Sequence, residues 1–92
     1  MPVFSISYDV SENSTTSYEK IEKAITDNCG GYCKYAETSW IVTFSGNASD
    51  LSNKLTSTGF GKGDCLLVIK VLNEYQGWLN ENKWDTIRTF FK

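Results

Sequence analysis

The chain has 92 residues, a length that fits one small domain in which folding buries roughly 60–65 % of the surface that the unfolded chain exposes. Hydrophobic residues make up 40 % of it and aromatic residues 14 %, a composition that excludes an intrinsically disordered chain. Eleven acids and nine bases give a net charge of −2, and the bases are spread along the sequence, which argues against a broad phosphate-binding face unless two chains pool their charges.

The first ten residues, MPVFSISYDV, lack the charged and apolar regions of a signal peptide. Nor does any stretch approach the roughly 18 apolar residues that span a bilayer, so we expect a cytoplasmic protein that does not insert into a membrane. The three cysteines, Cys29, Cys33 and Cys65, lack the paired spacing of a zinc site. They are expected to be reduced, half-buried apolar residues.

Residues 3–9 alternate between large apolar and small polar side chains, which predicts a strand that ends at Asp9. Ser17 then precedes apolar residues at helical spacing, so a helix is predicted over residues 18–28. The glycines that follow Cys29 tolerate positive φ and are expected to end this helix in that conformation.

The β-forming residues between Tyr32 and Phe44 are divided by the polar residues 37–39, which predicts a hairpin. Asn47 lies three residues before Asp50, in an arrangement close to a capping box, so a second helix is predicted over residues 48–57. The turn GFGKG and the run DCLLVIKV follow. The run predicts a fourth strand that is buried on much of both faces.

The order βαββαβ at this length predicts an α+β fold of the ferredoxin-like type, with two helices on one face of a four-stranded antiparallel sheet. We expect a single domain over residues 1–92, with a core at 1–72 and an aromatic-rich extension at 73–92. The extension is too apolar to be a solvated tail, and a short last helix is expected to cover an edge or a face of the sheet, in this chain or in a partner. The residues expected to pack there, or at a dimer interface, are Tyr75, Trp78, Trp84, Ile87 and Phe91.

The chain contains no histidine, which removes the most common general base near neutral pH and the most common zinc ligand. Asp9 is the best placed acid, because it ends a strand that is expected to be central and so rigid. It could present its carboxylate to a metal or substrate, or it could simply accept hydrogen bonds from loop amides. A single carboxylate becomes a credible Mg²⁺ ligand chiefly when a symmetric dimer brings two copies together.

Two further patterns have an ordinary structural explanation beside a functional one. The turn GFGKG, Gly59 to Gly63, could cradle a phosphate, but it precedes a strand and not a helix, so a helix-to-strand turn is favoured, and Asp64 is expected to be a turn or edge residue. The aromatic residues could stack on nucleic acid bases. The strands SISYDV and SWIVTF contain no basic residue, however, so packing in the core or at a dimer interface is favoured.

The segments SISYDV, YAETSWIV, DCLLVIKV and YQGWLNENKWDTI together resemble the small bacterial and phage proteins labelled SinR-like, which are similar in turn to the CRISPR-associated Cas-two family. The resemblance covers nearly the whole chain. It implies a ferredoxin-like homodimer in which the aspartate that closes the first strand, here Asp9, lies near the dimer seam. In some members of that family this aspartate is the proposed residue of a Mg²⁺-dependent nuclease, while others are non-catalytic dimers that hold DNA.

Three functional hypotheses follow. The favoured one is a homodimeric binding or assembly module without catalysis, with nucleic acid as a conceivable partner. The alternative is a Mg²⁺-dependent endonuclease for RNA or DNA that uses paired Asp9 carboxylates across the dimer. A third hypothesis is a phage or mobile-element accessory that binds a host protein through its aromatic C-terminal segment.

Overall fold

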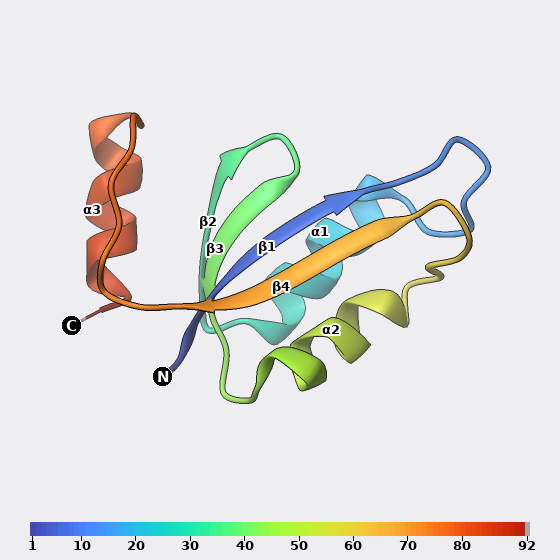
Figure 1. Cartoon of the computed structure of the whole chain (residues 1–92), viewed down its shortest axis with the longest axis horizontal. Coiled ribbons are helices and arrows are strands. Elements are labelled where there is room, and N and C mark those ends of the chain that lie inside the picture. The colour runs from blue at the N-terminus through green and yellow to red at the C-terminus, as the bar shows by residue number, and fades with distance from the viewer. Residues whose placement is uncertain (92) are drawn as a thin grey trace.

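Four strands and three helices make up the computed structural model, which describes residues 1–91 (Figure 1). In chain order they are β1 (Val3–Asp9), α1 (Tyr18–Asn28), β2 (Gly31–Ala36), β3 (Ser39–Thr43), α2 (Ala48–Thr56), β4 (Cys65–Val71) and α3 (Glu81–Thr89). The strands form one antiparallel sheet in the order β2-β3-β1-β4. This α+β arrangement is compatible with the expected small ferredoxin-like fold. Lys92, the last residue of the expected extension, lies outside the described residues.

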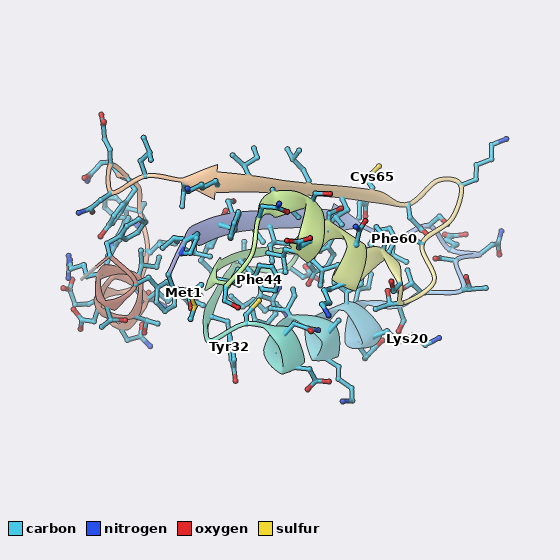
Figure 2. All side chains as sticks on the ribbon, turned by 90° about the horizontal axis from the view of Figure 1, so that it is seen from below. Met1, Lys20, Tyr32, Phe44, Phe60 and Cys65 are labelled. Atoms are coloured by element: carbon cyan, nitrogen blue, oxygen red, sulfur yellow. The ribbon has the colours of Figure 1, made fainter. Side chains whose placement is uncertain are left out.

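The alternating pattern of β1 divides the sheet into two faces. Phe4, Ile6 and Tyr8 are buried, and they point toward the layer formed by α1 and α2. Trp40 and Val42 of β3 are buried on the same side. Figure 2 shows both helices on this one side of the sheet. The core is therefore a two-layer sandwich of helices and sheet. On the opposite sheet face α3 covers the β2 side, where Cys33 and Thr43 are buried, and the β4 side is left bare.

Both core helices begin as their capping residues predict. The Ser17 side chain accepts a hydrogen bond from the backbone N–H of Lys20, and Asn47 forms a complete capping box with Asp50. The end of α1 differs from the expectation. Gly30 and Gly31 do not adopt positive φ; only Gly59 and Gly63 do so among the described residues.

Gly31 has a steric role instead, because a Cβ atom there would lie 2.7 Å from Cε1 of Phe90. The absence of a side chain at Gly31 thus lets the end of the C-terminal segment lie against β2. Helix α3 packs beside β2, at the end of the sheet that is remote from the loop between β1 and α1 (Figure 1).

The prediction that β4 is buried on both faces is wrong. β4 is an edge strand that pairs only with β1, and each of its residues is half-buried or exposed. Leu67 is 58 % exposed and Ile69 is 49 % exposed, because they lie on the face opposite α1 and α2, on the side that α3 does not cover. A run of apolar residues does not by itself distinguish a central strand from an edge strand with one bare face.

None of the helices in residues 1–91 has the length and apolarity that crossing a membrane requires.

Candidate functional site

Asp9 lies at the end of β1, which is a central strand as expected, since β3 and β4 flank it. Its carboxylate is exposed, and its Oδ1 atom accepts a hydrogen bond of 3.2 Å from the hydroxyl of Tyr18 on α1. Across the sheet its register partner is Cys65, an exposed free cysteine. The structure therefore presents Asp9 to solvent beside a phenol and a thiol.

A single chain does not supply a set of ligands that would hold Mg²⁺ at Asp9. No group of three or more histidine, cysteine, aspartate or glutamate side chains is close enough to bind one ion within residues 1–91. Magnesium is usually held by one or two carboxylates together with water and phosphate oxygens. Any metal site at Asp9 therefore needs a carboxylate from a second copy or oxygens from a substrate.

Asp64 is the most strongly engaged acid, although the sequence indicated only a turn or edge residue. Its Oδ1 accepts a hydrogen bond of 2.8 Å from the backbone N–H of Ser11. Its Oδ2 accepts two, one of 2.6 Å from the Ser14 hydroxyl and one of 2.9 Å from the backbone N–H of Gly61. The Ser14 hydroxyl and the two backbone amides lower the pKa of Asp64 to about 2. Asp64 thus ties the loop after β1 to the turn before β4.

The same contacts explain why GFGKG is a turn and not a phosphate site. The backbone N–H of Gly61, which a phosphate cradle would use, already donates to the Asp64 carboxylate. Gly59 and Gly63 have φ values of +124° and +93°, so the turn needs glycine at both positions. The prediction of a helix-to-strand turn is confirmed, with an internal carboxylate in the place where an external anion would bind.

The three cysteines are free thiols, as expected, but they differ in exposure. Cys29 and Cys33 are buried, and burial raises the pKa of both thiols, that of Cys29 to about 11. Both are therefore protonated and poorly nucleophilic near neutral pH. Cys65 was expected to be half-buried but is exposed at the start of β4.

The uncovered part of the sheet face opposite α1 and α2 is a further candidate site. Successive residues of a strand point to opposite faces, so the residues that alternate with the core residues lie here: Ser5 and Ser7 on β1, and Leu67 and Ile69 on β4. Ser5 pairs with Ile69, and Ser7 pairs with Leu67. We call these four residues the open-face strip. It places two exposed, bulky apolar side chains directly beside two small polar ones.

The C-terminal segment forms a second candidate site with the adjoining end of the sheet. Ile87 is only 4 % exposed, so α3 is anchored, and Tyr75 stacks on both Trp84 and Phe91. Trp78, by contrast, is 98 % exposed. Four of the five aromatic-segment residues singled out in the sequence therefore pack within the chain, and the fifth projects into solvent.

Between this segment and the sheet lies a hollow of about 520 Å³. Its walls come from the ends of β2 and β4, the middle of β3, the segment after β4, and α3. We call it the aromatic hollow, after its ring-bearing lining residues Tyr35, Tyr75, Trp78, Trp84 and Phe91. The sequence indicated the rings but not the hollow, because the hollow depends on where α3 docks.

Neither a family model nor a curated protein matches this chain.

Proposed function

We propose that this chain is a binding and assembly module that acts as a homodimer and has no catalytic activity of its own. The observation that carries the proposal is the open-face strip, in which Leu67 and Ile69 are about half exposed on the part of the sheet face that no helix covers. Exposed apolar side chains that gather on one face are typical of interaction surfaces.

The strip has the shape that a two-fold interface needs. In such an interface the same patch of both subunits meets itself, so the patch must be complementary to its own copy. Here Leu67 and Ile69 stand next to Ser7 and Ser5, and the bulky side chains of one copy can lie over the serines of the other.

The proposal also includes the finer fold assignment, a ferredoxin-like sandwich with an aromatic C-terminal extension. The antiparallel sheet in the order β2-β3-β1-β4, with α1 and α2 on one face, supports it. So does the resemblance to the SinR-like and Cas-two proteins. The absence of catalysis is proposed because Asp64 is committed to three hydrogen bonds and because no group of three or more potential metal-ligand side chains forms within residues 1–91.

The test is the oligomeric state of the wild type and of Leu67→Glu, measured by sedimentation equilibrium over a range of protein concentrations. We expect the wild type to be a dimer and Leu67→Glu to be a monomer, because two glutamates would be buried at the two-fold interface without partners. Tyr32→Glu is the matched control, since Tyr32 is also a half-exposed apolar residue but lies beside Trp40 on the helix side of the sheet. A monomeric wild type, or a dimer that Leu67→Glu leaves intact, would contradict the proposal.

A second candidate is the Mg²⁺-dependent nuclease, which the exposure of Asp9 at the end of a central strand favours. In this hypothesis two Asp9 carboxylates meet across the dimer, because no group of three or more potential ligand side chains forms within residues 1–91 of one chain. Cleavage of RNA or DNA by the purified wild type in the presence of Mg²⁺, lost in Asp9→Asn but kept in Glu12→Gln, would establish it. Cleavage that persists in Asp9→Asn would assign the activity to another site or to a contaminant.

A further inference from the structure

The aromatic hollow offers a second binding site, which lies on the same sheet face as the open-face strip and next to it, since its lining residue Ile41 is the register partner of Ser5. With a volume of about 520 Å³ it falls within the range of roughly 300–1,000 Å³ that is typical of small-molecule sites. Its walls combine the sheet, through Tyr35, Ile41 and Val71, with α3, through Trp84 and Ile87. These are parts of the chain that are well separated in sequence, so the hollow exists only in the folded protein.

The rings of the hollow are held in place by one another. Tyr75 and Trp84 are 5.9 Å apart between ring centroids and 16° from parallel, and Tyr75 and Phe91 are 5.2 Å apart and 24° from parallel. Gly77 passes over Trp84, where a Cβ atom would lie 3.7 Å from the indole. Trp78 follows directly and keeps its ring uncovered at the rim. The hollow thus has an ordered aromatic wall and one ring free to cover a ligand.

Within residues 1–91 the lining of the hollow carries negative charge only. Glu74 is the lining residue that carries a formal charge, and it makes no ion pair with any residue in 1–91. The neighbouring cation Arg88 is already shared between Glu81, at 3.5 Å, and Asp85, at 3.0 Å. Lys83 does not line the hollow; it lies near Cys33 of β2, where its charge counters the effect of burial on the thiol pKa.

We propose that the aromatic hollow binds a small organic cation with an apolar body, an alkyl- or arylammonium compound. The faces of aromatic rings carry negative electrostatic potential and attract such cations, most strongly at tryptophan. The Glu74 carboxylate adds a direct attraction for positive charge and a repulsion for anions. The apolar walls from the sheet and α3 accept the body of the ligand. This chemistry disfavours phosphate-bearing ligands at the same place.

The experiment compares three soluble probes that share one phenyl body: 2-phenylethylammonium, neutral 2-phenylethanol and anionic phenylacetate. Each is titrated into the full-length protein while the three indole N–H signals are followed by ¹H–¹⁵N NMR. Trp78 and Trp84 line the hollow and report on it. Trp40 is an internal reference, because its indole N–H donates a hydrogen bond to the Tyr8 hydroxyl in the buried core.

We expect the signals of Trp78 and Trp84 to move in a saturable way, that of Trp40 to stay fixed, and the affinity to follow the order cation, neutral, anion. Glu74→Gln should weaken binding of the cation roughly fivefold, to near that of the neutral probe, as expected for one solvent-accessible ionic contact. Glu12→Gln, an acid in the loop at the far end of the molecule, should change nothing (Figure 1). Trp78→Ala should weaken the binding of all three probes, and the variant should still fold, since Trp78 is almost fully exposed.

Three results would overturn the proposal. The first is the absence of any shift at Trp78 and Trp84, and the second is an anion or neutral probe that binds as tightly as the cation. The third is a shift that follows protein dilution and not ligand, which would mean that a second copy fills the hollow. The dimer proposed above is tested by Leu67→Glu, outside the hollow, so the two proposals fail separately.

Discussion

The indole N–H of Trp40 donates a buried hydrogen bond of 2.9 Å to the hydroxyl of Tyr8. Ile6 is the register partner of Trp40, so Tyr8 lies one diagonal step further along β1 on the same face of the sheet. The bond joins two strands within the helix-covered core, where both residues are less than one-tenth exposed. Burial also raises the pKa of Tyr8, which keeps its hydroxyl protonated at physiological pH.

Replacing Tyr8 with Phe should therefore leave a buried indole N–H without an acceptor. We expect the free energy of unfolding to fall by about 1–3 kcal/mol, the cost of an unsatisfied buried donor. Urea denaturation of the wild type and Tyr8→Phe would measure it. Tyr32→Phe is the control, because the exposed Tyr32 touches the same indole only through its ring edge, and it should change stability by less than about 0.5 kcal/mol.

The carboxylate of Asp64 makes stability depend on pH. Its pKa is about 2 in the folded protein, against 3.8 as the ordinary value, so below about pH 4 the unfolded chain takes up a proton that the folded chain does not. The stabilisation is complete above pH 4 and is lost as the pH falls from 4 toward 2. Thermal unfolding midpoints across this range should fall more steeply in the wild type than in Asp64→Asn, and parallel curves would show that Asp64 is not responsible.

Gly31 and Gly61 form a matched pair for testing the close approach of the C-terminal segment. A Cβ atom at Gly31 would meet Phe90 at 2.7 Å, whereas one at Gly61 would meet nothing within 4 Å. Gly31→Ala should destabilise the protein by about 1–3 kcal/mol, as overpacking does, and should raise hydrogen exchange in α3. Gly61→Ala should have little effect, and equal effects of the two substitutions would contradict the proposed contact.

The first residues of α2 and α3 allow a similar comparison of helix caps. Asn47 completes a capping box with Asp50, while Asn80 precedes α3 without a side-chain hydrogen bond to the helix. Asn47→Ala should lower the free energy of unfolding by about 1 kcal/mol, and Asn80→Ala by much less. Chemical denaturation of the two variants provides the measurement. A larger loss in Asn80→Ala would mean that capping is not what distinguishes these two positions.

Local patterns in the sequence were sufficient for most of the fold. The alternation of Phe4, Ile6 and Tyr8 identified the core face of β1, and Ser17 and Asn47 marked two helix starts correctly, because these signals act over a few residues. The exposure of Leu67 depends on which strand is at the edge of the sheet and which part of the sheet the helices leave uncovered. Neither can be predicted from the run DCLLVIKV alone.

The candidate sites were less accessible to sequence analysis for the same reason. Asp64 binds partners up to 53 residues away in the chain, and no spacing rule connects an acid before a strand to the loop that contains Ser11. Asp9 was located correctly at the end of a central strand, but its contact with Tyr18 follows from how α1 packs. The rings of the C-terminal segment were evident, whereas the separate environments of Trp78 and Trp84 depend on the docking of α3.

The free side of β4 has a consequence for how the protein behaves in concentrated solution. Seven residues in regular register, with Lys70 as their one charge and no proline or bulge to interrupt pairing with β1, leave a row of backbone amides and carbonyls ready to accept another strand. Such an edge can template open-ended aggregation into fibrils, because each added strand exposes a new edge. Unless a binding partner covers this edge, the charge of Lys70 is the main feature of β4 that opposes the pairing of further strands. Lys70→Val should therefore markedly increase fibril formation.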